Sequence, residues 1–521
     1  MKKATIRFTS LLFICFSSSV TFAQLSSPKI DLMMLDALKK FNVAGASIAV
    51  VKDGKVIHAK GYGFANIETK KPVTETTNFQ IASNSKAFTT TALSILEDEG
   101  KIKWTDKVKD ILPQFKMYND YVTENFNIQD LLTHRSGLGL GVGDLMFFPD
   151  GANFTITDVL TSFQHFKPVS AFRTQFNYDN SLYLVAGEVI AKVSGMSCEA
   201  FVQKRIIDQL QMKNTYAGMS LMKGKSNLAT PHSSESGTIK TIPTLELQVN
   251  GAAGGIISNA ADMAKWMIVR LNKGKYGTDL KETLFSEKNH NEMWRIHTVM
   301  NVHPDPRYNP HFNGYGLGWG INDEKGYLKV SHTGGLPGML SIVVMYPDLN
   351  LGLVIFTNTE NGGAGLFSAV ANSISDSYLG LDDFGWTDKI AESMQQGKNN
   401  GDDVTKKVWE KVQSSKSVNI KNENFTGVYL DKWFGKIEVF EKDKQLWFKS
   451  YRSPKLNGPM SFYNANTFAI KWEYQAMNCD AFTMFSLDEN GKAQSIKMKG
   501  ISPNIDFSFD FQDLDLQRVE K

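Results

Sequence analysis

The sequence predicts a mixed α/β (α+β) protein with one antiparallel sheet flanked by helices, a helical subdomain, and a small all-β domain after them. Three observations predict this arrangement. β-like runs lie near both ends of the first 385 residues, helical patterns fill the stretch between them, and apolar residues alternate with polar ones after residue 424. The chain has 521 residues, which is enough for one large domain and a smaller one.

The first 23 residues are typical of a secretory signal peptide. Lys2, Lys3 and Arg7 precede a short apolar run, and Thr21 and Ala23 are the small residues that signal peptidase favours. We therefore expect cleavage after Ala23 and a secreted or periplasmic protein without a transmembrane anchor, because the apolar run is too short to span a bilayer. The segment carries the whole net charge of +3, so the mature protein is neutral and nucleic acid is not an expected partner.

The cysteines and histidines give no sign of a metal site. Cys15 belongs to the signal, and Ile14 before it fits a lipid-attachment site poorly, which argues against a lipoprotein. Cys198 and Cys479 lie far apart in the sequence and are expected to be inert core residues. The nine histidines are scattered, with no H-x-x-x-H pair, so we expect no metal and no cofactor.

The region from residue 24 to 385 is expected to form the large domain. A hairpin signal at Asp53-Gly54 joins two β-like runs between residues 46 and 61, and strand-like runs return between residues 315 and 357. One sheet closed by the two ends of this region accounts for both sets of strands. Helices are expected over residues 83–100, 127–134, 181–193, 260–271 and 363–379.

The rest of the chain divides into two parts. Residues 386–420 are charged and glutamine-rich, and we expect a linker with helical stretches. Residues 421–521 are expected to form an all-β domain, a small barrel or a sandwich. One of its predicted strands comes from the alternation of Ile505, Phe507, Phe509 and Phe511 with polar residues.

Ser83 and Lys86 are the candidate nucleophile and base. Residues three apart on a helix face the same way, so Lys86 is expected beside the Ser83 hydroxyl, and the start of a helix favours negative charge there. The same S-x-x-K spacing occurs at Ser26 and at Ser220, but only Ser83 opens a convincing helix. The alternative is a helix cap with a solvated lysine.

Two further motifs add polar groups. Tyr178 and Asn180 form the only Tyr-x-Asn of the chain and precede a helix, and they offer a phenol and an amide. His332 and Thr333 lead into two glycines on a predicted strand, where a substrate could approach the backbone closely. A backbone N–H of this strand could pair with that of Ser83 as an oxyanion hole.

These three motifs, in this order, resemble the serine β-lactamase and penicillin-binding-protein superfamily over about residues 30–380. The resemblance is closest to the branch that contains class C β-lactamases, D-alanyl-D-alanine carboxypeptidases, D-aminopeptidases and related esterases. It implies a β-lactamase/transpeptidase-like fold, and the C-terminal domain resembles the small lipocalin-like barrel appended to some such hydrolases. The stretches at 131–138, 251–266 and 314–319 are similar to the family as well.

The resemblance also implies a role for each motif residue. Ser83 becomes acylated, and Lys86 either removes its proton or keeps the local field positive. Tyr178 acts as a general acid and base with a pKa lowered by Lys86. In the same way the family implies that Asn180 holds the substrate amide, that His332 and Thr333 place a carboxylate or other polar end, and that the backbone N–H groups of Ser83 and Gly335 form the oxyanion hole.

The histidine at position 332 stands where class C β-lactamases carry lysine. A histidine is neutral about half the time or more near pH 7, so it grips a carboxylate less well. We therefore expect a D-amino-acid-directed peptidase or an esterase acting on a small molecule or short peptide. The alternatives are a class C-like β-lactamase and a non-catalytic penicillin-binding or ligand-sensing module, and the chain could form oligomers through its C-terminal domain. Residues 141–168, 226–250 and 303–312 are expected at the rim of the pocket.

Overall fold

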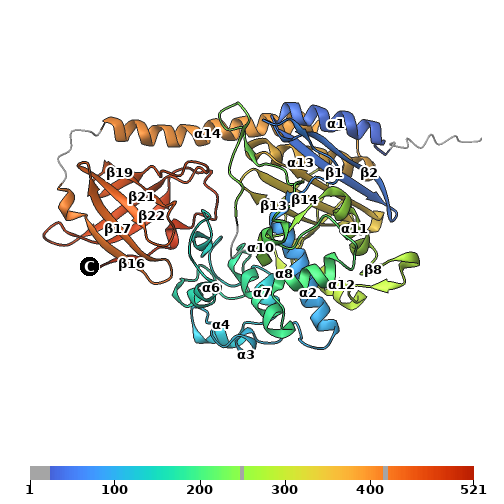
Figure 1. Ribbon diagram of the computed structural model, residues 1–521, viewed down its shortest axis with the longest axis horizontal. Coiled ribbons are helices and arrows are strands. Elements are labelled where there is room, and N and C mark those ends of the chain that lie inside the picture. Colours follow the sequence, from blue (N-terminus) through green and yellow to red (C-terminus); the bar gives the residue numbers. More distant parts are fainter. Residues whose placement is uncertain (1–23, 247–250, 415–420, 521) are drawn as a thin grey trace, which may run out of the picture.

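The computed structural model describes residues 24–246, 251–414 and 421–520. The predicted signal peptide and its cleavage site after Ala23 lie outside the described residues. Two bodies are visible in Figure 1, a large α/β part and a β-barrel beside it, with one long helix running along both. No helix within the described ranges combines the length and apolar composition needed to cross a bilayer.

A nine-stranded antiparallel sheet forms the centre of the large part. Its strand order is β10-β11-β12-β13-β14-β15-β1-β2-β3. The strands are β1 (Gly45–Lys52), β2 (Lys55–Asn66), β3 (Lys71–Pro72), β10 (Thr298–Val299), β11 (Asn313–Tyr315), β12 (Gly320–Glu324), β13 (Tyr327–Leu336), β14 (Met339–Tyr346) and β15 (Leu351–Thr357). Ile48 of β1 pairs with Ile355 of β15, so the two chain ends of this part close one sheet, which confirms the predicted arrangement.

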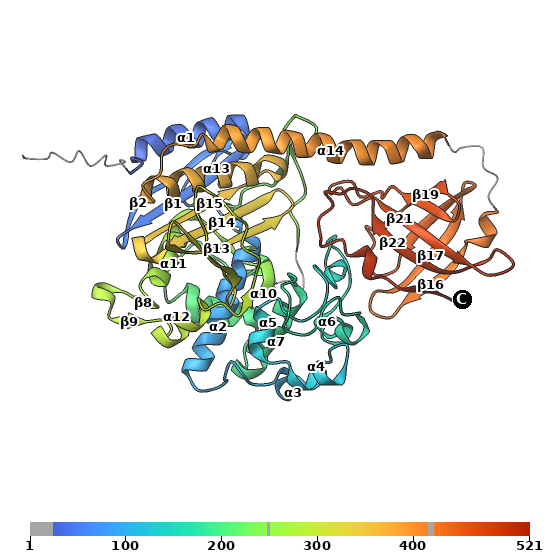
Figure 2. The ribbon, with the colours of Figure 1, turned by 180° about the vertical axis from the view of Figure 1, so that it is seen from behind.

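Helices cover both faces of the sheet, and the composition of β1 follows from this. Ile48 and Val50 belong to the core shared with α1 (Ser27–Lys40) and α13 (Glu360–Tyr378). Ala49 and Val51 belong to the core on the opposite face, which includes residues of α11 (Ala260–Leu271). A strand with both faces covered has apolar residues throughout rather than in alternation. The view from behind shows the same layers (Figure 2).

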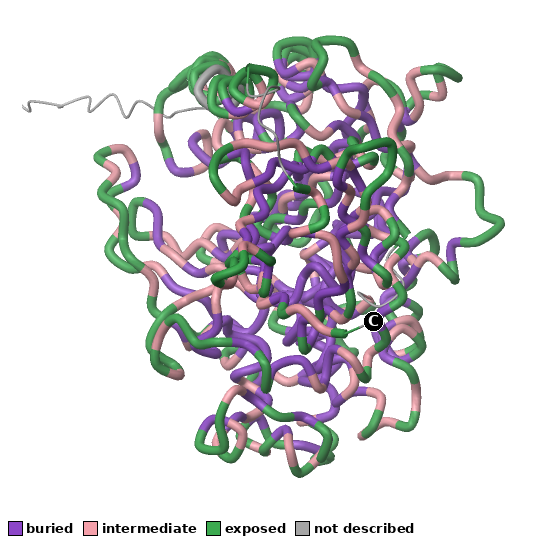
Figure 3. The backbone as a smooth tube through the Cα atoms, turned by 90° about the vertical axis from the view of Figure 1, so that its left-hand side faces the viewer, coloured by how far each residue is buried: buried purple, intermediate pink, exposed green. Residues whose placement is uncertain are grey.

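A helical subdomain lies on the face of α11 and carries most of the remaining short elements. Its core merges with that of the sheet, and buried residues fill the middle of the molecule while exposed ones follow its outer loops (Figure 3). The helices are α2 (Lys86–Asp98), α3 (Val108–Ile111), α4 (Asp120–Asn125), α5 (Ile128–Leu132), α6 (Ile156–Ser162), α7 (Ser181–Ser194), α8 (Cys198–Val202), α9 (Met219–Met222), α10 (Gly251–Gly254) and α12 (Glu287–Met293). Three small two-stranded sheets pair β4 (Phe79–Gln80) with β7 (Ile257–Ser258), β5 (His232–Ser233) with β6 (Lys240–Thr241), and β8 (Lys275–Tyr276) with β9 (Glu282–Thr283).

The segment expected to be a partly helical linker forms one helix, α14 (Trp386–Ser414). After it, eight antiparallel strands make a closed barrel, which decides between the predicted barrel and sandwich. The strands are β16 (Gly427–Asp431), β17 (Gly435–Lys442), β18 (Gln445–Ser450), β19 (Asn457–Asn464), β20 (Thr467–Ile470), β21 (Ala481–Leu487), β22 (Ala493–Gly500) and β23 (Leu516–Val519). Val428 of β16 pairs with Val519 of β23 and closes the ring.

The strand predicted over residues 505–511 is wrong. This segment is part of a long loop between β22 and β23, with a 3₁₀ turn at Phe511–Asp513. Its backbone has no strand to pair with, because β22 and β23 already pair with each other and close the barrel. The alternation instead reflects two different environments of the loop. Phe509 lies in the hydrophobic core, whereas Ser508 and Asp510 are buried in polar contacts with residues 143 and 144 of the large α/β part.

The barrel docks on the segment around α6. Arg452 donates two hydrogen bonds of 2.8 Å to the Asp158 carboxylate and lies over the Phe154 ring, 3.9 Å from its centroid. Phe154 also packs against Phe434 of the barrel, with ring centroids 5.6 Å apart. The Arg452 guanidinium holds the pKa of Asp158 well below its usual range. A paired charge at a packed aromatic contact fixes the orientation of the two bodies.

Candidate active site

Ser83 lies in a tight turn between β4 and α2. The turn is a 3₁₀ helix, Ala82–Ser85, and the α-helix begins at Lys86 rather than at Ser83 as the sequence predicted. Residues i and i+3 of a 3₁₀ turn are eclipsed, so the Lys86 side chain stands beside that of Ser83. The difference in helix type therefore preserves the predicted contact.

The turn is held in a strained conformation by its neighbours. Ala82 has a φ of +49°, which costs a residue with a Cβ about 1–2 kcal/mol. The Ser341 hydroxyl donates to the Ile81 carbonyl at 2.8 Å, and the Ile256 N–H donates to the Ser85 hydroxyl at 3.0 Å. Bonds on both sides of Ala82 over-determine its backbone, which is how strain persists at functional positions.

Gly334 allows β13 to pass directly against this turn. A Cβ on Gly334 would lie 2.2 Å from the Ile81 carbonyl oxygen and 3.1 Å from the Ala82 Cβ. We predicted from the sequence that a substrate would approach the backbone of this strand closely. At Gly334 the group that lies close to the strand is instead the turn that carries Ser83. A Cβ on Gly335 would meet only Leu340, at 3.5 Å, so Gly335 leaves its side of the strand open to the pocket.

Lys86 is fully buried and uses all its hydrogens. Its Nζ donates to Ser83 Oγ at 3.0 Å, to Asn180 Oδ1 at 2.7 Å and to the Ala253 carbonyl at 3.0 Å. Burial lowers its pKa from 10.5 to about 7, against the opposing effect of nearby Asp144 and Asp179. An amine of this kind is neutral in a large fraction of molecules at neutral pH and then has a lone pair for the Ser83 proton.

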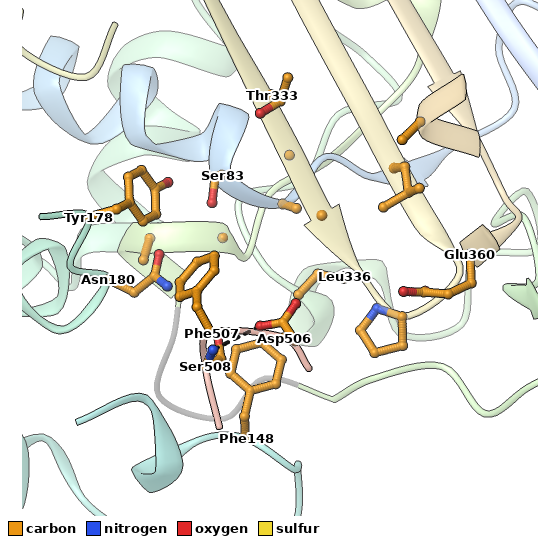
Figure 4. A pocket seen from close by; sticks show the side chains of 18 of the residues that line it. Ser83, Phe148, Tyr178, Asn180, Thr333, Leu336, Glu360, Asp506, Phe507 and Ser508 are labelled. Carbon is orange, nitrogen blue, oxygen red and sulfur yellow. Dashed lines mark hydrogen bonds between the residues drawn. The ribbon is translucent and has the colours of Figure 1, made fainter. Parts of the chain in front are cut away.

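Tyr178 lies beside Ser83 and Lys86, as the motifs predicted. Its hydroxyl faces Ser83 (Figure 4), and Lys86 Nζ lies 4.8 Å from its ring centroid. The His134 ring packs on it, with centroids 4.2 Å apart. The expected lowering of its pKa is wrong: burial raises the pKa of Tyr178, and the adjacent Ser83 hydroxyl offsets only part of the effect. Tyr178 is therefore a protonated phenol at neutral pH and a proton donor.

Asn180 lines the same pocket and has a partner at each end of its amide. Its Oδ1 accepts from Lys86, and its Nδ2 donates to Asp144 Oδ2 at 2.8 Å. Each end retains further capacity, since a primary amide carries two N–H bonds and two lone pairs. The amide is thus oriented by the protein and keeps one donor and one lone pair for a substrate.

His332 is neutral at neutral pH, and its neutral fraction is larger than the sequence indicated. Its Nδ1 donates to the Thr333 carbonyl at 2.6 Å, and its Nε2 accepts from the Tyr315 hydroxyl at 2.9 Å. Burial and the neighbouring Lys86 lower its pKa to about 3. A neutral imidazole has no charge with which to hold a carboxylate. Thr333 is exposed on the same strand and lines the pocket.

These residues surround a cavity of about 410 Å³. Ser83, Tyr178 and Asn180 line one end and Glu360 another, while Phe507 of the barrel loop closes a side (Figure 4). The described lining residues include no lysine and no arginine, but they include the carboxyl groups of Glu360 and Asp506. Burial raises the pKa of Glu360 to about 7, with a smaller contribution from Asp506.

The rim was predicted only in part. Phe148, from the expected segment 141–168, lines the cavity, whereas no described residue of 226–250 or of 303–312 does. Tyr308, from the last of these segments, donates to Asp376 of α13 instead, at 2.8 Å. The place expected for these loops is taken by residues 506–508 of the barrel.

Sequence reasoning missed several residues that shape the site. They are His134, Asp144, Tyr315, Glu360, Phe507 and Ser508. His134 and Tyr315 lay in stretches noted as similar to the family, and Asp144 lay in the segment 141–168 expected at the rim. Phe507 and Ser508 were assigned to a strand, and nothing in the local sequence marked Glu360. Cys198 and Cys479 are buried and unpaired, and the described ranges contain no group of three or more potential metal ligands.

The family model described as Beta-lactamase matches residues 33–371, well over half of the chain. The chain belongs to the Beta-lactamase family. It is thus a member of the β-lactamase and penicillin-binding-protein superfamily of serine hydrolases, as the motifs indicated. Residues 416–518 match a second model, a domain of unknown function called DUF3471.

Curated relatives in this family are distant. The unguisins hydrolase ungD of Aspergillus violaceofuscus is 27% identical over 384 residues, which are 69% of this chain and 67% of that protein. Protein flp of Staphylococcus aureus strain MW2 is 28% identical over 340 residues, 64% of each chain. The chain spans about three fifths to two thirds of the length of the curated relatives it matches.

Two solved structures share the fold over nearly the whole chain. The octameric penicillin-binding protein homologue from Pyrococcus abyssi has a TM-score of 0.59 at 20% identity and covers 94% of this chain and all of its own. SurE has a TM-score of 0.55 at 16% identity, with 95% of this chain and 99% of its own covered. At these identities the likeness concerns the fold alone.

Proposed function

We propose that the protein hydrolyses an amide or ester through an acyl-enzyme on Ser83, as a D-amino-acid-directed peptidase or an esterase. The observation that carries this proposal is the 3.0 Å contact between Lys86 Nζ and Ser83 Oγ, made by an amine with a pKa of about 7. A nucleophile within hydrogen-bond reach of a base poised near the working pH is the arrangement that acyl transfer needs.

Acylation begins when neutral Lys86 takes the Ser83 proton. The Ser83 oxygen attacks the carbonyl carbon, and the electron pair of the carbonyl moves onto its oxygen, which the backbone N–H groups of Ser83 and Gly335 stabilise. When the carbonyl re-forms, the amine or alcohol leaves and takes a proton from the Tyr178 phenol. The Lys86 ammonium then returns a proton to Tyr178.

Deacylation repeats these steps with water in place of Ser83. Neutral Lys86 removes a proton from the water as its oxygen attacks the acyl carbon. The Ser83 oxygen then leaves with a proton from the Tyr178 phenol, and the Lys86 ammonium returns a proton to Tyr178. The raised pKa of Tyr178 supports a donor rather than a base role for the phenol. Asn180 holds the substrate amide with its free N–H, and Thr333 binds a polar end of the substrate.

The charges around the pocket favour a substrate without a carboxylate. His332 is neutral, the described lining residues include no cationic side chain, and Glu360 and Asp506 repel an anion. A class C-like β-lactamase or a carboxypeptidase must hold a carboxylate beside the bond it cleaves. A free ammonium near Glu360, as in an aminoacyl substrate, suits the pocket better.

Active-site labelling tests the proposed chemistry. A fluorescent fluorophosphonate should label wild type and Ser220→Ala equally, because Ser220 belongs to another S-x-x-K and lies outside the pocket. Ser83→Ala should not be labelled. Equal labelling of Ser83→Ala and wild type would show that Ser83 is not the nucleophile.

A substrate panel tests the proposed class. D-aminoacyl p-nitroanilides, their N-acetylated forms, p-nitrophenyl esters, D-Ala-D-Ala peptides and nitrocefin should be compared on wild type and Ser83→Ala. We expect turnover of the esters and of the anilides with a free amine, and little turnover of nitrocefin. Faster hydrolysis of nitrocefin would favour the β-lactamase alternative, and labelling without turnover of any compound would favour a binding module.

The remaining proposals concern the whole chain. We propose a signal peptide over residues 1–23, a hydrolase domain over 24–385, a connection over 386–420 and a barrel domain over 421–521. We also propose export, for which N-terminal sequencing of the exported protein should begin at Gln24. Oligomers through the barrel are tested by light scattering of the full chain, since one fold neighbour is described as octameric.

A further inference from the structure

Four consecutive hydrogen bonds connect the barrel to the nucleophile. Ser508 Oγ donates to Asp144 Oδ2 at 2.9 Å, and Asn180 Nδ2 donates to the same oxygen at 2.8 Å. Asn180 Oδ1 accepts from Lys86 Nζ, which donates in turn to Ser83 Oγ. Apart from Ser83 the members are buried, so water does not readily replace a lost partner.

Asp144 decides which way the Asn180 amide points. An amide has one accepting and one donating end, and its accepting end must face the Lys86 amine. The donating end then needs an acceptor on the opposite side, which the Asp144 carboxyl supplies. Without that acceptor only the Lys86 contact opposes the reversed amide, so a fraction of molecules would adopt it and turn the amide N–H groups toward those of Lys86. The lysine would then lose its partner and its position beside Ser83.

The barrel loop fixes Asp144 from two directions. Besides the contact of Ser508, the Asp510 carboxyl oxygens accept from the backbone N–H groups of Gly143 and Leu145, at 2.7 and 2.9 Å. These two residues flank Asp144 in the chain. The neighbouring Gly141 has a φ of +70°, and a Cβ there would lie 2.6 Å from the carbonyl oxygen of the barrel residue Phe507. The two loops interlock too closely for a side chain between them.

We propose that Asp144 is a positioning residue for Lys86 and that Ser508 makes the barrel part of the catalytic apparatus. The inference rests on the proposed function, because it requires the Ser83 acyl-enzyme. It follows that a side chain of the second domain, with no contact to Ser83, controls the rate at which Ser83 reacts.

The test measures two rates in the full-length chain. The first is the rate of labelling by a small fluorophosphonate, and the second is kcat per labelled site for a p-nitrophenyl ester, which has no amide for Asn180 to bind. The variants are Ser508→Ala, Asp144→Leu and Asp144→Asn. The matched control is Ser502→Ala, since Ser502 lies in the same loop but outside the pocket.

We expect Ser508→Ala to slow both rates about tenfold, the usual effect of one lost hydrogen bond in a buried network, with KM nearly unchanged. Asp144→Leu should slow both about a hundredfold. Asp144→Asn keeps an accepting oxygen and should restore the rates to within about threefold of wild type. Ser502→Ala should behave as wild type.

Two outcomes would overturn the inference. Wild-type rates per labelled site in Ser508→Ala and Asp144→Leu would show that the contacts do not position the lysine. A lower labelled fraction or melting temperature with unchanged rates per site would show a structural role only. Failure of the proposed function is distinct from both, because wild type would then not be labelled at Ser83.

Discussion

The pH dependence of the reaction distinguishes Lys86 from Tyr178 as the base. Burial lowers the pKa of Lys86 to about 7, whereas it raises the pKa of Tyr178. The base must be deprotonated, so the rate rises with pH up to the pKa of the base and is constant above it. A profile that levels off near neutrality therefore identifies the lysine.

The expected profile is that for the titration of Lys86. Burial raises the pKa of the neighbouring Asp179 to about 7 as well, so its ionisation over the same range broadens the rise. With a pKa of about 7, roughly one tenth of the lysine is neutral at pH 6 and roughly nine tenths at pH 8, so kcat/KM should rise about tenfold between them and then level off. An ordinary lysine with a pKa near 10.4 would give a rise of about a hundredfold over the same interval and no plateau below pH 10.

The assay is hydrolysis of a p-nitrophenyl ester between pH 5 and 10, with the rate of Ser83→Ala subtracted. Glu360 also has a pKa of about 7, so Glu360→Gln is the control, and the midpoint should stay near 7 in that variant. Asp179 raises the pKa of Lys86, so the midpoint should move to lower pH in Asp179→Asn. A rate that continues to rise tenfold per pH unit beyond pH 9 would refute the assignment of the base.

Two further predictions concern stability. Gly334→Ala should lower the unfolding free energy by about 1–3 kcal/mol, because its Cβ would press on the Ile81 carbonyl. Gly335→Ala should leave the thermal midpoint nearly unchanged. Equal thermal midpoints for the two variants in a calorimeter would contradict this prediction. Arg452→Ala should cost about 1 kcal/mol at the docking contact, measured by urea unfolding. Because Arg452 lowers the pKa of Asp158, the ion-pair part of this difference should be complete above pH 4 and shrink steadily as the pH falls below the ordinary pKa of a carboxyl group. A difference as large at pH 2 as at pH 6 would contradict the assignment.

Local patterns predicted much of the fold. The helix expected over residues 260–271 is α11, Ala260–Leu271, with Asn259 as its N-cap, where the side chain accepts from the Asp262 N–H. The Asp53-Gly54 hairpin is present, and both residues have positive φ, as its tight turn requires. Helix caps and tight turns depend on residues that are neighbours in the sequence, so they can be predicted from the sequence alone.

The barrel loop is where local reasoning failed. The alternation of residues 505–511 has the period of a strand, but a strand also needs a partner, and the closed barrel leaves none. Asp144 was expected only as part of a rim segment, and its contact with Ser508 was not predicted, because that contact joins segments far apart in the sequence. The direction of the pKa shift at Tyr178 depends on burial in the folded protein, which no motif reports.

The contact between Ser508 and Asp144 joins positions 364 residues apart, which has a consequence for biosynthesis. Contacts of such sequence separation tend to form late in folding, because a long stretch of chain must be closed into a loop before they can form. The hydrolase half leaves the ribosome long before the loop that reaches its pocket. On the inference above, a nascent or prematurely ended chain holds the serine and lysine without the support that aligns them, so full reactivity arrives only with the finished protein.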